Sequence, residues 1–403
     1  MRRSIDAVVI GAGPAGLATS RALALLGVAH VVLERGQPGH TWANLYDSLV
    51  LHTGRALSSL PGLEFPRGTP QFPSRAELLL YLRRYAETFD IPVESGADVV
   101  RARHDQSGWT IETRDGSSLR AAALVVATGV AANPYVPGVP QRDRFGGRVI
   151  HSAEYRRPEP YVGRRVLVVG AGNSAGEIAA ELAQAGARVT VAIRSGATTV
   201  PRDIAGVPIQ YLAIAVAWLP RRAQQLAAAA VGEMSSLVRG ASPLPTARVG
   251  GCRAVPLIGF HLVDAVKAGR IVLRGGVDSF TPDGVRFADG AEEAFDDVIL
   301  ATGYRAALGF LGDAIRLDAC GFGLRRGLVA SADHPSLFFV GHNYDSRGAL
   351  LNIARDSRRA ARSVSEWLCG TARTSTEMPR RSSGTRSESS RRSSAGRDAA
   401  SSG

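Results

Sequence analysis

The sequence predicts an α/β protein in which one structural unit occurs twice, and three observations predict it. First, the glycine motif GAGPAG at residues 11–16 is matched by GAGNSA at residues 170–175. Second, each motif follows a short β-branched run and precedes an Ala-rich stretch, which is the order strand, turn, helix. Third, the hydrophobic runs at residues 124–129 and 298–303 both end in Ala-Thr-Gly. We therefore expect two Rossmann-like dinucleotide-binding domains, each with three layers (ββα).

The first unit begins at the N-terminus. Residues 4–10 are almost all of buried type, as expected for a parallel strand that is covered on both faces. Pro14 suits the first turn of the following helix, and a second strand then ends at Glu34. Glu34 lies 23 residues beyond Gly11, where this fold places a carboxylate on a ribose hydroxyl, and Arg35 beside it could contact the adenine side. The cofactor-binding candidates of this unit are Gly11, Gly13, Pro14, Ala15, Gly16, Glu34 and Arg35.

Such a glycine turn binds a dinucleotide for a physical reason. Glycine has no Cβ, so the backbone can press against a pyrophosphate, whose charge is stabilised by the N–H groups and the positive dipole end of the following helix. A chain with two such turns is suited to pass electrons between two nucleotides.

The second unit ends differently from the first. We expect a strand at residues 165–169, a helix at residues 173–185 and a partner strand at residues 189–193. Where the first unit ends in an acid, this one has Arg194 and Ser195, a cation and a hydroxyl that suit a 2′-phosphate. The sequence therefore predicts NADPH on the second unit and FAD on the first. The candidates of the second unit are Gly170, Gly172, Ser174, Ala175, Arg194 and Ser195.

The two Ala-Thr-Gly strand ends are further candidates. Glycine at such a strand end permits close approach of the backbone to a cofactor, and the alternative is a plain tight turn after a buried strand. Short antiparallel strands are expected around residues 109–113 and 285–287, where Asp-Gly turns flank them. The strand ends add the cofactor-binding candidates Thr128, Gly129, Thr302 and Gly303.

Two stretches depart from the repeated unit. Residues 203–250 are Ala- and Leu-rich and broken by prolines, which predicts a helical insertion that caps the substrate side; the alternative is a helical pair on the second domain without ligand contact. The apolar stretch at about residues 207–219 contains Pro208 and Gln210 and is shorter than the roughly 20 residues of a membrane span, so no transmembrane helix is expected. The Ser- and Arg-rich stretch from residue 371 is expected to be disordered.

The composition is that of a globular protein, with 45% apolar and 21% charged residues among 403. The formal charge is +12, but Lys267 is the only lysine, so the basicity is arginine and no nucleic-acid partner is expected. Cys252, Cys320 and Cys369 form no Cys-x-x-Cys pair, which excludes the dithiol relay of disulfide-reductase flavoproteins and favours a reduced, cytoplasmic protein. The eight histidines have no ligand spacing, so no metal site is expected.

Residues 145–155, FGGRVIHSAEY, carry the most specific motif. They fit the pattern Phe-x-Gly-x-x-x-His-x-x-x-Phe/Tyr and lie just before the second glycine turn. With the two glycine turns, this string resembles the class B flavin-containing monooxygenases, and most closely the YUCCA-type enzymes of plants, over roughly residues 5–368. Other matching pieces are Leu51-His52, Gly172-Asn173-Ser174, Pro201-Arg202 and Ala301-Thr302-Gly303-Tyr304.

The resemblance implies that the NADPH-binding domain is inserted in the FAD-binding domain. The implied domains are residues 1–155 (FAD-binding, first part), 156–304 (NADPH-binding, with the helical insertion at about 203–250), 305–370 (return to the FAD-binding domain) and 371–403 (disordered tail).

The resemblance also implies a reaction. NADPH delivers hydride to FAD, the reduced flavin meets O₂, and a C4a-(hydro)peroxyflavin forms that must be shielded from water. The Leu51-His52 pattern favours oxidative decarboxylation of a small-molecule aryl 2-oxo acid such as indole-3-pyruvate. The alternatives are N- or S-oxygenation of a soft nucleophile, and a non-oxygenating NADPH oxidase or redox-sensing flavoprotein. Tyr155 is followed by Arg-Arg-Pro instead of the Trp-Pro of the Baeyer–Villiger branch, which disfavours ketone-to-ester insertion.

Roles for single residues follow from the same resemblance. The catalytic candidates are His52 and Asn173. His52 could donate a hydrogen bond toward the flavin or the peroxide, or could serve packing. Trp42 would pack beside the isoalloxazine, and Arg202 is a second candidate for the 2′-phosphate. Arg55 would contact a flavin phosphate or a substrate acid, or would be a solvated surface charge.

Overall fold

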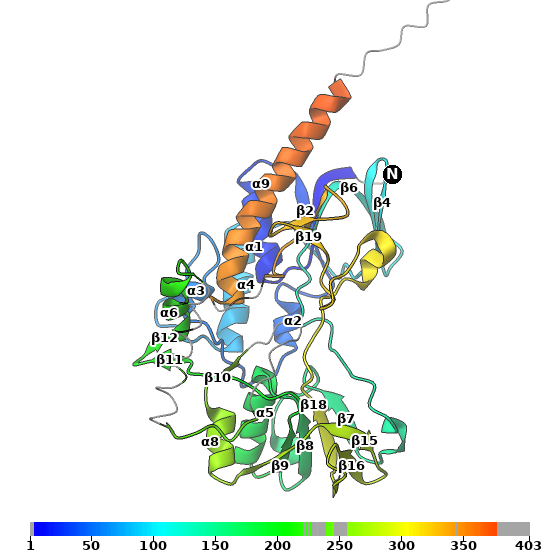
Figure 1. The fold of residues 1–403 in the computed structure, drawn as a ribbon. Helices are drawn as coiled ribbons and strands as arrows, with labels where there is room; N and C mark the ends of the chain where they lie inside the picture. The colour runs from blue at the N-terminus through cyan, green and yellow to red at the C-terminus, as the bar shows by residue number, and fades with distance from the viewer. Residues whose placement is uncertain are drawn as a thin grey trace, which may run out of the picture.

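The computed structural model describes residues 4–220, 223, 226, 232, 239–245, 256–343, 345 and 347–376. The chain forms two α/β bodies stacked one on the other, each with its own sheet, and the long helix α9 (Ala349–Thr376) runs along the upper body (Figure 1). The two glycine motifs lie in different bodies, so the expected duplication of an α/β unit is confirmed.

The first body contains a nine-stranded sheet in the order β19-β20-β21-β6-β1-β2-β3, with β4 and β5 branching from β6. Its strands are β1 (Ser4–Ile10), β2 (His30–Glu34), β3 (Val93–Ser95), β4 (Val99–Asp105), β5 (Gly108–Thr113), β6 (Ser118–Val126), β19 (Arg325–Arg326), β20 (Ala330–Ser331) and β21 (Leu337–Phe339). The central strands pair in parallel and are buried, which is why they read as β-branched runs.

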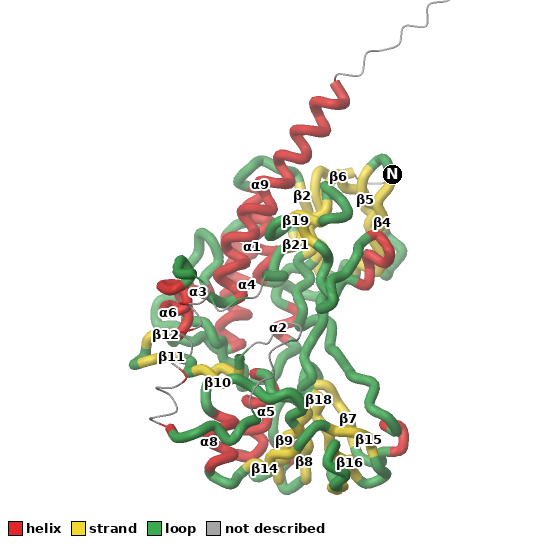
Figure 2. The backbone as a smooth tube through the Cα atoms, in the orientation of Figure 1, coloured by secondary structure: helices red, strands yellow, loops and turns green. Residues whose placement is uncertain are grey.

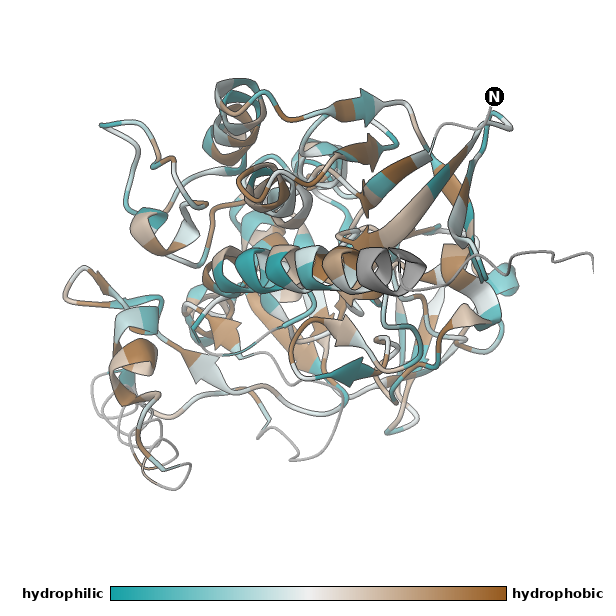
Figure 3. Ribbon diagram, turned by 90° about the horizontal axis from the view of Figure 1, so that it is seen from above, coloured by the Kyte–Doolittle hydropathy of each residue, from teal (hydrophilic) through white to brown (hydrophobic). Residues whose placement is uncertain are grey.

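Helices cover one face of this sheet. They are α1 (Pro14–Ala24), α4 (Arg75–Thr88) and α9, with the short helices α2 (His40–Ala43) and α3 (Arg55–Ser58) nearby, whereas η3 (Gly309–Ala314) lies on the other face, against β4. Leu17 of α1, Leu78 of α4 and Val364 of α9 belong to one buried core with β1 and β6. In Figure 3 much of the outer side of α9 has the hydrophilic colour, as expected for an amphipathic helix on a sheet. The opposite face packs on the β4–β5 hairpin around Trp109, which gives the three layers.

The second body contains a five-stranded sheet in the order β14-β9-β8-β18-β7, with all neighbours parallel. These strands are β7 (Arg148–His151), β8 (Arg165–Val169), β9 (Arg188–Ala192), β14 (Ile271–Arg274) and β18 (Asp297–Leu300). Helices α5 (Asn173–Gln184) and α8 (His261–Lys267) cover one face, and the meander of β15 (Val277–Phe280), β16 (Gly284–Phe287) and β17 (Glu292–Ala294) covers the other. The expected Rossmann-like layers are therefore confirmed in both bodies.

Strand β7 corrects the expected domain boundary. It lies before residue 156 but pairs with β18, and Phe145 just ahead of it packs on Phe280 of the second body. The second body therefore begins before residue 148 and not at residue 156. The remaining short elements are η1 (Arg142–Arg144), η2 (Glu159–Tyr161), β10 (Thr199–Val200), β11 (Asp203–Ile204), β12 (Val207–Pro208), α6 (Ile209–Val216) and β13 (Leu257–Ile258).

The expected insertion is described in part. Figure 2 shows α6 as a short helix beside the upper body, and its Gln210 Nε2 donates to the carbonyl of His52 at 3.0 Å. Gln71 of the first body also donates to Gly206, at 2.9 Å. Helix α6 and the residues before it therefore contact the first body, whereas most of residues 221–255 lie outside the described residues.

The C-terminal expectation also changes. Helix α9 continues to Thr376, beyond the residue at which the disordered tail was expected to begin, and residues 377–403 lie outside the described residues.

Each glycine turn lies against an Ala-Thr-Gly strand end. Gly11 has φ of +103°, and a Cβ there would be 2.8 Å from the carbonyl oxygen of Ala127. Gly170 has φ of +136°, and a Cβ there would be 2.3 Å from the carbonyl oxygen of Ala301. These two glycines are required by the protein's own backbone, because an L side chain at either position would meet a carbonyl that cannot move aside.

Candidate functional site

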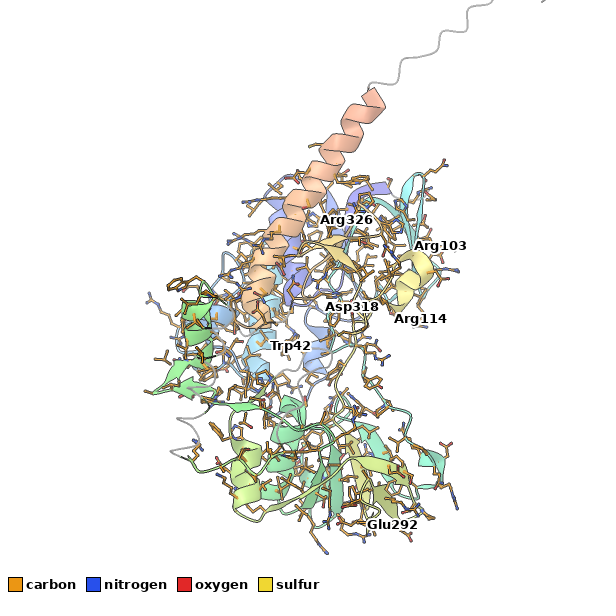
Figure 4. The ribbon with its side chains drawn as sticks, viewed as in Figure 1. Trp42, Arg103, Arg114, Glu292, Asp318 and Arg326 are labelled. Atoms are coloured by element: carbon orange, nitrogen blue, oxygen red, sulfur yellow. The ribbon has the colours of Figure 1, made fainter. Side chains whose placement is uncertain are left out.

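A cavity of about 990 Å³ lies where the two bodies meet. The first glycine turn, residues 39–53, the first turn of α5, helix α6 and the start of α9 all contribute to its wall. Figure 4 places Trp42 at this junction. The predicted site residues that line the cavity are Gly11, Gly13, Pro14, Ala15, Glu34, Trp42, His52, Thr128, Gly129, Asn173 and Ser174.

The first glycine turn is built to receive an anion. Gly13 is the N-cap of α1 and makes no side-chain cap, and a Cβ built on it meets nothing within 4 Å. Glu34 at the end of β2 accepts from Ala12 N at 2.7 Å and from Gly36 N at 3.0 Å, which closes the turn over the strand end. The free N–H groups of a helix start beside an open glycine fit a pyrophosphate, and the acid beside them fits a ribose.

The second glycine turn has the same geometry. Gly172 is the uncapped N-cap of α5, and a Cβ there also meets nothing within 4 Å. Arg194 and Ser195 are exposed just beyond β9, on the same strand-end side as the turn. Arg202 lies elsewhere, over the ring of Phe72 at 4.5 Å. Because Arg194 directly follows β9, the strand that pairs with β8, it is better placed than Arg202 for a group bound at this turn.

Several predicted site residues lie outside the cavity wall. Gly16 is buried behind its turn, where a Cβ would be 1.7 Å from the oxygen of Gly11. Thr302 donates to the carbonyl of Tyr135 at 2.5 Å, so this strand end binds the neighbouring connection between the bodies. Arg55 donates to the carbonyl of Thr69 and is exposed. The residues of the predicted set outside the wall are Gly16, Arg35, Gly170, Gly172, Ala175, Arg194, Ser195, Arg202, Thr302 and Gly303.

His52 is held from both bodies. Its Nε2 lies 2.5 Å from Oε1 of Glu177 on α5, and the other carboxylate oxygen, Oε2, accepts from the hydroxyl of Tyr46. Burial, and then the charge of Glu177, raise the pKa of Tyr46 far above its ordinary value, so this phenol stays protonated and donates. Tyr46 is 3% exposed and packs in the core of the second body, which fixes the segment that carries His52.

Two amide side chains complete the wall. Asn173 Oδ1 accepts from Ile258 N at 2.7 Å, so its NH₂ group is the end left for a ligand. Gln210 uses its NH₂ group on the carbonyl of His52, and its Oε1 is buried without a hydrogen-bond partner among the described residues. Residues of α6 and α9 such as Leu212 and Ile353 form the apolar part of the wall, which excludes water.

Glu177 and Gln210 were not among the residues predicted from the sequence. A signal for Glu177 was present, because Asn173, Glu177 and Glu181 are spaced i, i+4, i+8 and therefore share one face of a helix. Gln210 was noted only as an interruption of an apolar stretch. Its function as a lining residue depends on α6 contacting the first body, which the sequence does not show.

The chain is similar to known proteins over much of its length. The family model described as pyridine nucleotide-disulphide oxidoreductase matches residues 8–206. The chain is 36% identical over 313 residues to indole-3-pyruvate monooxygenase YUCCA1 of Oryza sativa subsp. japonica, covering 74% of this chain and 77% of that protein. It is 34% identical over 315 residues to probable indole-3-pyruvate monooxygenase YUCCA1 of Arabidopsis thaliana, covering 74% and 75%.

Solved structures of two monooxygenases match the fold of this chain. The flavin-containing monooxygenase from Stenotrophomonas maltophilia is 28% identical, with a TM-score of 0.73 over 91% of this chain and 99% of that one. Cyclohexanone monooxygenase from Rhodococcus sp. Phi1, bound to NADP⁺, has a TM-score of 0.69 over 91% and 85% at 20% identity, a likeness in fold alone.

The two bodies and their relatives define a flavin-dependent monooxygenase, an enzyme class that uses a flavin and a pyridine nucleotide. The chain belongs to the class B flavin-containing monooxygenase family and has YUCCA-type enzymes among its relatives. The sequence contains no Cys-x-x-Cys pair, so the disulfide part of the matched model's description has no counterpart in it.

Two other features, a membrane-spanning helix and a metal-binding cluster, are absent from the described residues. None of the helices described here combines the length and the apolar character that crossing a membrane requires. Within the same residues, no group of three or more His, Cys, Asp or Glu side chains is arranged to hold a metal ion.

Proposed function

We propose that this protein is an NADPH-dependent FAD monooxygenase that oxidatively decarboxylates an aryl 2-oxo acid. The observation that carries the proposal is the cavity, which brings the first glycine turn, His52, Asn173 and an apolar wall to one place at the junction of the bodies. The balanced reaction is R–CO–COO⁻ + O₂ + NADPH + H⁺ → R–COO⁻ + CO₂ + NADP⁺ + H₂O.

FAD is proposed for the first body. The uncapped start of α1, the open space at Gly13 and the carboxylate of Glu34 would hold its pyrophosphate and ribose. The cavity continues from this turn past Trp42 to His52, which provides room for the ring system of a flavin. A bound flavin would supply the electron transfer and the oxygen activation that no side chain of the chain provides.

NADPH is proposed for the second body. The open Gly172 and the uncapped start of α5 would hold its pyrophosphate, and Arg194 with Ser195 would bind the 2′-phosphate. The first turn of α5 lines the common cavity through Asn173 and Ser174, so a nucleotide there would reach the same space as the flavin. With this assignment, the NADPH-binding domain comprises the expected residues 156–304 together with strand β7. The FAD-binding domain comprises the residues before and after them.

The substrate class rests on the wall and on the relatives. Apolar residues of α6, such as Ile209, Leu212 and Val216, suit an aromatic ring. The NH₂ group of Asn173 and the imidazole of His52 would bind the polar 2-oxo acid end and orient it. The relatives named as indole-3-pyruvate monooxygenases act on a compound of this class, which supports the same choice here.

The test is a product assay with the flavin-loaded protein. NADPH oxidation, hydrogen peroxide and the shortened acid are measured with and without indole-3-pyruvate and phenylpyruvate, under ¹⁸O₂. We expect NADPH oxidation to rise with the 2-oxo acid and one ¹⁸O atom to enter the arylacetate. Substrate-independent oxidation in which all NADPH is recovered as hydrogen peroxide would refute the oxygenase proposal and favour an NADPH oxidase.

A further inference from the structure

The imidazole in the cavity wall belongs to one body and its partner carboxylate to the other. His52 precedes α3 in the first body, and Glu177 lies in the second turn of α5 in the second body, 125 residues further along the chain. The His52 side chain is 25% exposed and the Glu177 side chain is 19% exposed. His52 lines the cavity, whereas Glu177 does not. Glu177 therefore reaches the cavity through the two wall residues that it contacts, His52 and Tyr46.

We propose that Glu177 is a positioning residue that, across the junction of the two bodies, fixes the orientation and the tautomer of His52. The proposal rests on the proposed function only for its turnover assay. His52 would be the candidate catalytic residue that contacts a ligand, and Glu177 would hold it.

The hydrogen bonds define the tautomer. An ionised carboxylate only accepts hydrogen bonds, so the His52 nitrogen that faces Glu177 must carry a proton. That nitrogen is Nε2, which leaves Nδ1 for a group in the cavity, since Nδ1 has no protein partner among the described residues. In its neutral form the imidazole is thereby held as the Nε2–H tautomer, in the way that a buried acid orients a catalytic histidine elsewhere.

The carboxylate is itself fixed. Tyr46 donates to Oε2 while His52 donates to Oε1, so each oxygen of Glu177 has one donor. Gln210 of α6 holds the carbonyl of His52 at 3.0 Å, so backbone and side chain of this residue are both restrained. Because α5 belongs to the second body, His52 has this orientation only while the two bodies are docked as they are here.

Glu177→Gln is the decisive variant. An amide has one accepting end, so a glutamine can accept from His52 or from Tyr46 but not from both. The matched control is Glu181→Gln, because Glu181 lies one turn further on α5 and accepts from Tyr155 at 2.9 Å without contacting His52. Both variants remove one negative charge from the same helix face.

We expect Glu177→Gln to lower coupled product formation per NADPH by about tenfold or more, since small misplacements of a reacting group have effects of this size. The KM for NADPH and the FAD content should stay within twofold of wild type, and Glu181→Gln should keep wild-type coupling. Combining Glu177→Gln with His52→Ala should be no worse than His52→Ala alone. Equal losses in the two glutamine variants, or additive losses in the double variant, would overturn the proposal.

A second measurement does not depend on turnover. In protein labelled with ¹⁵N-histidine, the signal that His52→Ala removes should show an Nε2–H imidazole, and Tyr46→Phe should weaken this preference without abolishing it. A His52 signal that is the same in wild type and Glu177→Gln would overturn the proposal even if no 2-oxo acid is a substrate. If the tautomer changes as expected but no arylpyruvate is turned over, the proposed function fails and the positioning stands.

Discussion

The two open glycines allow the two cofactor assignments to be tested separately. Gly13 has φ of −80° and ψ of −171°, and Gly172 has φ of −85° and ψ of −178°, so both have an extended backbone that alanine also adopts. A Cβ at either position meets no protein atom within 4 Å. The protein alone therefore gives no reason for glycine at these two positions, and a closely approaching ligand does.

The alanine substitutions should change the stability of the cofactor-free protein little and weaken cofactor binding strongly. For the protein without cofactor, replacing glycine at an extended position gains about 0.4–1 kcal/mol through the unfolded chain, while alanine is a poorer N-cap by a comparable amount, so stability should change by less than about 1 kcal/mol. For the loaded protein, each N–H bond to a charged phosphate that the methyl group prevents is worth about 1.5–3 kcal/mol. Loss of one such bond weakens binding about 10- to 150-fold.

The assay compares Gly13→Ala with Gly172→Ala. Gly13→Ala should lower FAD affinity, measured by titrating flavin into the cofactor-free protein, and should leave the KM for NADPH of the FAD-saturated enzyme unchanged. Gly172→Ala should raise the KM for NADPH and keep the FAD affinity of wild type. The reasoning is refuted if both variants bind both cofactors as wild type does, and the assignment is reversed if the two effects are exchanged.

Two further predictions concern charge. Arg194→Ala should lower the preference for NADPH over NADH by about 10- to 150-fold, from the loss of a charge-assisted bond, whereas Arg202→Ala should leave the ratio unchanged; equal ratios in wild type and Arg194→Ala contradict the 2′-phosphate assignment. Burial lowers the pKa of His30, His104 and His151 below the ordinary 6.5, so the folded state binds fewer protons than the unfolded state. The free energy of unfolding should therefore be highest above pH 6.5 and fall as the pH decreases from 6.5 toward the lowered histidine pKa values. Urea midpoints that do not change between pH 8 and pH 5 would contradict this expectation.

Most of the fold could be predicted because its signals are local. Strand β8 was expected at residues 165–169 and has these bounds, since a buried parallel strand between a charged start and a glycine turn leaves a clear β-branched run. Helix α5 ends within one residue of its expected end. Residues 148–151, which form β7, fell within the expected first domain, because they become part of the second sheet only through pairing with β18, almost 150 residues later.

The candidate site could be predicted where a residue serves a local motif, and not where it serves a distant partner. Glu34 was expected from its spacing to Gly11 as a ribose-binding carboxylate, which stays a prediction, and in the structure its carboxylate accepts from Ala12 N in the first turn. Glu177 has no role in the second glycine motif, and its contact joins residues 125 apart on different bodies. Only the docking of the bodies gives this acid its partner, and no periodicity in one chain records that docking.

Helix α5 thus links two properties that the sequence presents as separate. Its start offers free N–H groups to the proposed nucleotide at Gly172, and one turn later Glu177 holds His52 in the other body. A rotation that separates the two bodies would break the contact between Glu177 and His52. It would leave the N–H groups at Gly172 unchanged, because Gly172 caps the helix that carries Glu177. The variant Tyr46→Phe tests this link, because it removes the hydroxyl that donates to Glu177. It should keep nucleotide binding while it loosens His52 and increases the hydrogen peroxide released per NADPH. Unchanged peroxide release in this variant would show that the orientation of His52 does not depend on the Tyr46 hydroxyl.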